Sequence, residues 1–151
     1  PKCKCIKYVF LLSSTYATIV ILKMMLMSPL TSYFCLTRKV FANLEDTKFV
    51  SSVEDKKLVR IDPDVERVRR CHQNDLENII PFVVISLLYA LTAPELSAAL
   101  LHFCLFASSR VFHTVAYIGA QPQSSRGLSL IVGMLVTFSM FYRVLSKVFL
   151  L

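Results

Sequence analysis

Residues 67–82, "RVRRCHQNDLENIIPF", carry a dense group of polar side chains directly into a segment that is apolar enough for a membrane. The whole chain has 151 residues, of which 55% are hydrophobic, and its mean hydropathy is +0.58. A soluble domain of this size is normally less apolar. The composition therefore predicts an integral membrane protein, and the quoted stretch lies where a helix would enter the bilayer.

Four apolar runs follow one another along the chain. They cover residues 8–36, 79–93, 96–118 and 128–151. Because a bilayer core of ~30 Å needs roughly 20 helical residues, the second run is long enough only if its charged lead-in is helical as well. That lead-in starts with "DPD" at residues 62–64, which places an acidic N-cap before a proline at the first helical position. Both features indicate a helix start.

The runs predict a single membrane domain over residues 1–151, with an all-α fold. We expect a four-transmembrane-helix bundle, with helices at about residues 8–36, 64–93, 96–118 and 127–149 and a long loop at 37–61. The opening "PKCKCIKYVFLL" resembles the start of a cleavable signal peptide. The apolar run after it is too long for one, and no small-residue cleavage site closes it, so we expect a retained helix.

The distribution of basic residues predicts the orientation in the membrane. Ten Lys and Arg residues fall in residues 37–72 and in the connection between the third and fourth helices. The two termini and the "TAPE" turn at residues 92–95 carry four, or five if Arg143 is included. We therefore expect the two long loops in the cytoplasm and both termini in the lumen, although the lysines near the N-terminus favour the opposite arrangement.

The five cysteines are scattered and odd in number, which is not typical of a disulfide framework. Cys3 and Cys5 form a close pair, but zinc would need a second pair. We expect free thiols and no metal site.

Four polar residues of the opening stretch share one face of their helix, and His72 lies nearly opposite. At 100° per residue, Arg67, Arg70, Asn74 and Glu77 fall within an arc of about 80°. Charges at a helix mouth often only anchor the helix to lipid headgroups. The charges to which we assign this anchoring role are Lys23, Arg143 and Lys147.

A second polar stripe ends the third helix, with Arg110, His113 and Tyr117 at spacings of three and four. The second helix begins and the third ends on the same side of the membrane, so the two stripes should meet there, with Arg126 just beyond. Several cations facing one carboxylate suit a small ligand with more negative than positive charge. Glutathione has two carboxylates, one ammonium and a length near the ~10 Å between Arg70 and Glu77 along a helix.

Four motifs carry a resemblance to a known family. They are "LTRKVFAN" at 36–43, "DPDVERVRRCHQNDLENIIPF" at 62–82, "RVFHTVAY" at 110–117 and "QPQSSRGLS" at 121–129. Over residues 16–145 the chain resembles the membrane-associated proteins in eicosanoid and glutathione metabolism, the MAPEG family. The resemblance implies a homotrimer of four-helix subunits, with glutathione bound between neighbouring subunits near the cytoplasmic face.

The resemblance also implies roles for individual residues. Arg126 would be catalytic and would face the glutathione sulfur. The implied glutathione-binding residues are Arg38, Arg70, Asn74, Glu77, His113 and Tyr117. Two departures stand out: Cys35 replaces an arginine of similar proteins, and Gly127 and Leu130 replace a serine and a tyrosine of the prostaglandin E synthase branch.

The expected function is a membrane-bound glutathione transferase that also reduces lipid hydroperoxides. A thiol with a pKa near 8.5 is mostly protonated at neutral pH, so a cation beside the sulfur would raise the reactive thiolate fraction. Hydrophobic electrophiles and lipid hydroperoxides would enter from the bilayer, with glutathione as co-substrate. The family resemblance implies the endoplasmic reticulum membrane, with the mitochondrial outer membrane as a second location.

Two alternatives stay open. The first is a glutathione-dependent prostaglandin E synthase, and the second is a non-catalytic four-helix scaffold or channel. The net charge of +7 does not indicate a nucleic-acid partner, because the basic residues lie where the helices enter the membrane and the long loop carries charges of both signs. Anionic membrane lipid explains the charge balance better.

Overall fold

The computed structural model describes residues 2–51 and 55–150, with side chains from residue 4 onward. Four long helices make up most of this part of the chain: α1 (Lys2–Arg38), α2 (Pro63–Leu91), α3 (Leu96–Ile118) and α4 (Gln123–Phe149). Two short 3-10 helices, η1 (Glu45–Phe49) and η2 (Lys56–Leu58), lie in the loop between α1 and α2. Among the described residues, all four long helices are long and apolar enough to cross a membrane, which confirms the predicted fold class.

Two helices begin earlier than the apolar runs suggested. α1 is helical from Lys2 rather than from about residue 8, and α4 begins at Gln123 rather than at 127. α2 starts as the "DPD" signal predicted, since the Asp62 side chain accepts hydrogen bonds from the backbone N–H groups of Asp64 (2.9 Å) and Val65 (3.2 Å). This cap fixes the point at which the polar half of α2 begins.

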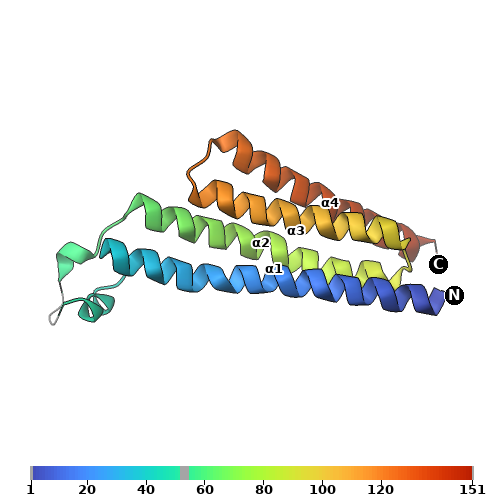
Figure 1. The fold of residues 1–151 in the computed structure, drawn as a ribbon, viewed down its shortest axis with the longest axis horizontal. Coiled ribbons are helices and arrows are strands. Elements are labelled where there is room, and N and C mark those ends of the chain that lie inside the picture. Colours follow the sequence, from blue (N-terminus) through green and yellow to red (C-terminus); the bar gives the residue numbers. More distant parts are fainter. Residues whose placement is uncertain (1, 52–54, 151) are drawn as a thin grey trace.

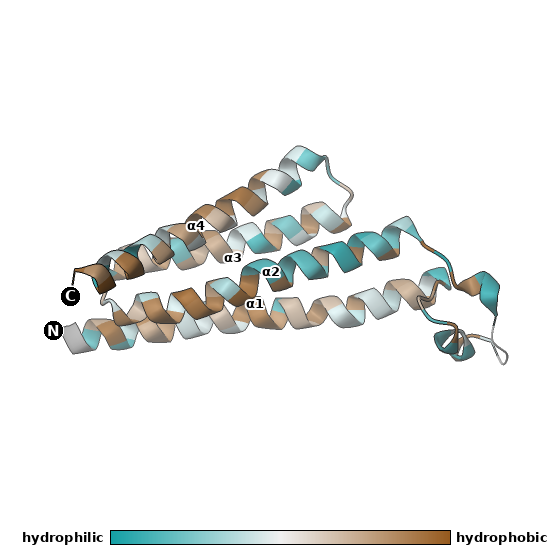
Figure 2. Ribbon diagram, turned by 180° about the vertical axis from the view of Figure 1, so that it is seen from behind, coloured by the Kyte–Doolittle hydropathy of each residue, from teal (hydrophilic) through white to brown (hydrophobic). Residues whose placement is uncertain are grey.

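The bundle has two distinct ends (Figure 1). α1 and α2 lie side by side, α3 packs beside α2, and α4 returns along α3, so both termini lie at one end. The α1–α2 loop and the α3–α4 connection lie at the other, which we call the loop end. Figure 2 shows that α2 is hydrophilic in its half nearest the loop end and hydrophobic in the other half. The polar stripe therefore lies at one end of the bundle.

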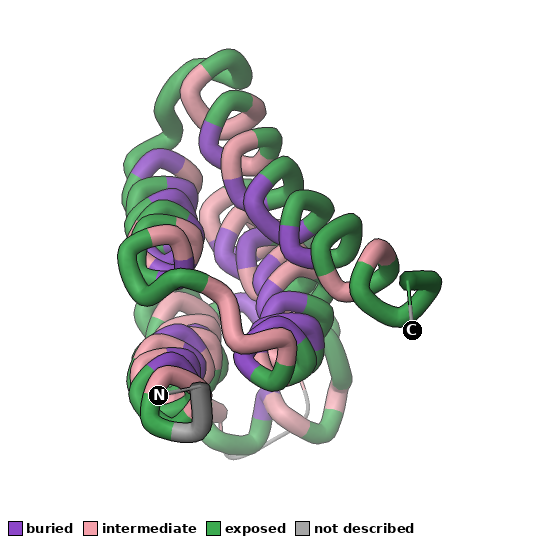
Figure 3. The backbone as a smooth tube through the Cα atoms, turned by 90° about the vertical axis from the view of Figure 1, so that its right-hand side faces the viewer, coloured by how far each residue is buried: buried purple, intermediate pink, exposed green. Residues whose placement is uncertain are grey.

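An aromatic core holds α2 against α3. The rings of Phe82 and Phe106 stack with centroids 3.7 Å apart, and Phe103 makes edge contacts with Phe82 and Tyr89. All four side chains are fully buried. Buried residues occupy the facing sides of the helices and exposed residues the outer sides (Figure 3). Many of the exposed residues are large and apolar, as expected for surfaces that face lipid.

The cysteines show no disulfide among those whose side chains are described. Cys5, Cys35, Cys71 and Cys104 are free thiols, as predicted for these positions. The side chain of Cys3 and the residue Pro1 lie outside the described part of the chain.

Candidate functional site

A hollow of about 270 Å³ opens at the loop end between the start of α2, the end of α3 and the start of α4. The residues that line it are Ile61, Pro63, Glu66, Arg67, Arg70, Tyr117 and Arg126. Three of the seven are arginines, so the hollow has a strongly positive wall. Three helices thus bring together residues that are far apart in the sequence.

Arg126 lies on the ring of Tyr117, with its guanidinium carbon 4.8 Å from the ring centroid. Its Nη2 also donates to Gln123 Oε1 at 3.1 Å, while its Nε is buried without a hydrogen-bond partner among the described residues. A cation on an aromatic face is held by the ring's quadrupole. The guanidinium is therefore oriented before any ligand binds.

A tight turn brings Arg126 back to Tyr117. α3 ends at Ile118, and a Cβ on the next residue, Gly119, would lie 2.9 Å from the Val115 carbonyl oxygen. Only glycine fits there without a shift of the backbone. α4 begins four residues later, so Arg126 sits in its first turn.

His113 continues the aromatic face of α3 away from the hollow. Its ring centroid is 5.3 Å from that of Tyr117, and its side chain is buried. The spacing of four residues places both rings on one face of the helix. Of the implied ligand residues, the chain thus gathers Arg70, His113, Tyr117 and Arg126 around one corner of the bundle.

The remaining α2 residues lie further along the polar face. Asn74 is half-buried and its Oδ1 accepts a hydrogen bond of 3.0 Å from Arg110 Nη2. Glu77 is exposed and accepts a hydrogen bond of 3.0 Å from Gln73 Nε2. Arg70 is exposed and has no salt-bridge partner within residues 2–51 and 55–150. Arg70 and Glu77 therefore face outward from the single chain.

Arg38 lies apart from the hollow in the single chain. It forms an ion pair with Asp64, whose other carboxylate oxygen accepts from Arg67 at 2.8 Å. Arg67 lines the hollow, so Arg38 is connected to it through one carboxylate. The role of Arg38 in binding a ligand stays a prediction.

Sequence reasoning missed a buried ionic cluster next to these residues. Lys23, which we expected to anchor α1 to headgroups, instead pairs with the buried carboxylate of Asp75, so that expectation was wrong. Asp75 was not singled out at all. One signal was available: Lys23 lies ~22 Å from the end of α1, too far for snorkelling to that end to relieve the charge.

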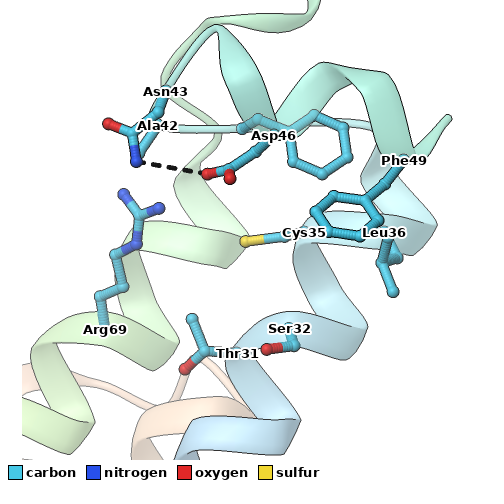
Figure 4. A pocket seen from close by; sticks show the side chains of 10 residues that line it. Thr31, Ser32, Cys35, Leu36, Ala42, Asn43, Asp46, Phe49 and Arg69 are labelled. Atoms are coloured by element: carbon cyan, nitrogen blue, oxygen red, sulfur yellow. Dashed lines mark hydrogen bonds between the residues drawn. The ribbon is translucent and has the colours of Figure 1, made fainter. Parts of the chain in front are cut away.

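A second hollow, of about 480 Å³, lies beside η1 and the last turns of α1 (Figure 4). Cys35 and Arg69 point into it, opposite Asn43, which donates to Asp46 at 3.3 Å. Arg69 also pairs with Glu66 at 3.0 Å. Cys35 thus lies in a different hollow from Arg126.

Across the described ranges 2–51 and 55–150, no three His, Cys, Asp or Glu side chains gather as ligands for a metal ion. The chemistry that this corner supports is that of fixed cations and hydrogen-bond donors around a small anionic ligand.

A comparison with known proteins finds a family and relatives that match this chain over most of its length, including the residues of the arginine-lined hollow. A family model described as the MAPEG family covers residues 13–146. Microsomal glutathione S-transferase 1 from Homo sapiens is 55% identical over 144 residues, covering 94% of this chain and 93% of the relative. The protein of that name from Sus scrofa is 54% identical over 140 residues, covering 92% and 90%. Prostaglandin E synthase from Rattus norvegicus is 35% identical over 139 residues, covering 92% and 87%.

The motif resemblance is therefore confirmed by matches over most of the chain. The family model spans all four long helices in whole or in large part, including every residue of the arginine-lined hollow. The chain belongs to the MAPEG family.

Proposed function

We propose that this protein is a membrane-bound glutathione transferase that conjugates glutathione to hydrophobic electrophiles. The observation that carries the proposal is the position of Arg126, held on the Tyr117 ring beside Arg70 at the end of four apolar helices. Relatives more than half identical are named glutathione transferases, while those named prostaglandin E synthase are more distant. Both arguments favour transfer to apolar electrophiles.

Glutathione suits the charges of the polar face. Arg70 can pair with a carboxylate of the peptide, since no other described residue neutralises it. Glu77 supplies an acid for the ammonium, and Asn74 supplies an amide between them. Residues 70 to 77 extend over ~10 Å of helix, which is about the length of an extended tripeptide.

A homotrimer would complete this site. Arg70 and Glu77 face outward from the single chain, so a ligand bound to them would be covered on one side only. A neighbouring subunit would supply the missing wall and exclude water. Exclusion of water strengthens every charge interaction inside the site.

The chemical step is attack by the glutathione thiolate. Loss of the thiol proton leaves an anionic sulfur, and the Arg126 guanidinium, which keeps its charge at any physiological pH, stabilises that anion. With an aryl halide, the sulfur forms a bond to carbon and halide leaves. With a hydroperoxide, the sulfur attacks one oxygen, the alcohol leaves, and a second glutathione converts the sulfenic acid to disulfide and water.

The second substrate would enter through the bilayer. The outer faces of the helices are lined by large apolar side chains, so an apolar electrophile dissolved in lipid can approach the loop end without crossing water. The relatives' name indicates a microsomal membrane, and we infer that the protein is a multi-pass protein of the endoplasmic reticulum.

Prostaglandin E synthesis is the second candidate. It is favoured by relatives that are 35% identical over most of the chain. Gly127 and Leu130 argue against it, because neither of these two positions carries a hydroxyl, whereas that branch of the family has a serine and a tyrosine there. A non-catalytic scaffold would use the same fold without thiol activation.

The test uses purified protein in lipid nanodiscs. We expect conjugation of glutathione to a chromogenic aryl halide, reduction of a lipid hydroperoxide, and a higher melting temperature when glutathione is added. Arg143→Ala, which removes an exposed arginine of α4 far from the hollow, is the matched control and should keep both activities. Stabilisation by glutathione without any turnover would favour the scaffold instead.

A further inference from the structure

A chain of charged side chains crosses three helices beside the candidate site. Lys23 of α1 pairs with Asp75 of α2, and the other Asp75 oxygen lies 3.9 Å from Arg110 Nε of α3. Asp75 and Arg110 are both 0% exposed, and the Lys23 side chain is only 16% exposed. Buried charges of this kind persist only when they are paired, so each depends on the others.

The cluster contacts Asn74, which lies on the polar face of α2 between Arg70 and Glu77. Arg110 Nη2 donates to the Asn74 side-chain oxygen at 3.0 Å. Arginine has donors and no acceptor, so this contact requires the amide oxygen of Asn74 to face Arg110. The amide nitrogen must then face away. In the described part of the chain it donates to no other residue, which leaves it available to a carbonyl or carboxylate.

Asp75 is the member that holds the cluster together. The cluster has two cations, Lys23 and Arg110, and one anion between them. Without the carboxylate, two buried cations would repel one another, and Arg110 would lose its only acidic contact among the described residues. Arg110 would then move toward water or lipid headgroups, and Asn74 would lose the donor that orients it.

We infer that Lys23 and Asp75 are positioning residues of the glutathione site. The Asp75 carboxylate, held by Lys23, attracts the Arg110 guanidinium across 3.9 Å, and Arg110 in turn orients the Asn74 amide with its nitrogen toward the bound peptide. The inference rests on the proposed function. Neither residue lines the hollow that contains Arg126, so the cluster should govern how tightly the peptide is held and not how the sulfur is activated.

The first test is Asp75→Asn, which keeps the size of the side chain and removes its charge. Affinity for S-hexylglutathione, measured by calorimetry in nanodiscs, should fall roughly ten- to a hundredfold, as expected if the Asn74 amide no longer donates to a carboxylate of the peptide. The KM for glutathione should rise in parallel. Turnover at saturating glutathione and the pKa of the bound thiol should stay near wild type, because Arg126 is untouched. Asp75→Glu, which keeps the charge, should recover part of the affinity.

The matched control is Ser86→Ala. It removes a buried hydrogen bond of 3.0 Å between Ser13 and Ser86, which joins the same two helices farther from the hollow. It should lower the melting temperature and leave glutathione affinity unchanged. If it weakens glutathione as much as Asp75→Asn does, the effect of Asp75 is general loosening of the bundle, and the positioning role is overturned.

A double variant tests whether Asp75 acts on glutathione binding through Asn74. If Asp75 acts through Asn74, Asp75→Asn should cause little further loss of affinity in an Asn74→Ala background. Additive losses would contradict the inference.

Should Asp75→Asn fail to fold, Lys23→Met tests the same cluster, and unchanged glutathione affinity in that variant would overturn the positioning role. A wild-type protein that does not bind glutathione refutes the proposed function itself, whereas binding with unaffected variants refutes only the positioning role.

Discussion

Removal of the Arg126 guanidinium should separate activation of the sulfur from retention of the peptide. The guanidinium carbon lies 4.8 Å above the Tyr117 ring, and a thiolate in direct contact with the guanidinium would lie about 4–5 Å from the centre of its charge. Two unit charges about 5 Å apart at an effective dielectric constant of about 20 interact by ~3 kcal/mol, which corresponds to ~2 pKa units. Arg126→Ala should therefore raise the pKa of bound glutathione by about one to two units.

The assay is thiolate absorbance near the ultraviolet edge, titrated with pH in wild type and variant. At neutral pH the thiolate population should fall about ten- to a hundredfold, and turnover should fall with it. The loss of rate should be smaller than the loss of thiolate, because a more basic thiolate is also a stronger nucleophile. Binding of S-hexylglutathione, which has no ionisable thiol, should change much less. A variant with the wild-type titration curve and rate would show that the sulfur is activated elsewhere.

Three further outcomes are expected. Glu77→Gln removes the acid assigned to the ligand's ammonium and should weaken glutathione by about 1.5–3 kcal/mol in calorimetry; unchanged affinity with an intact fold would make Glu77 a simple surface charge. Native mass spectrometry from mild detergent should show a homotrimer, and a stable monomer that binds glutathione would contradict the shared site. Asp62→Ala removes the N-cap of α2 and should cost about 1 kcal/mol, read as a lower melting temperature with glutathione affinity largely retained.

The fold could be predicted because its determinants are local. The length of each apolar run sets a membrane span, and the Asp62 cap with Pro63 sets the start of α2. The helix ends were less predictable. α1 continues back to Lys2 because a helix does not stop where hydrophobicity stops, and nothing in residues 2–7 breaks it.

The site could be predicted only in part. Helical spacing placed His113 and Tyr117 on one face, and the short connection to α4 brought Arg126 onto Tyr117. The pairing of Lys23 with Asp75 could not be predicted from the sequence, because it depends on which faces of α1 and α2 contact each other. That choice is made by packing over the whole bundle.

A structure of the protein in lipid nanodiscs with glutathione bound would show directly where the sulfur lies. We expect the sulfur within hydrogen-bond distance of the Arg126 guanidinium, and the peptide along the α2 face in contact with Arg70, Asn74 and Glu77. Glutathione in the hollow of Cys35 and Arg69, or with its sulfur far from Arg126, would contradict this expectation.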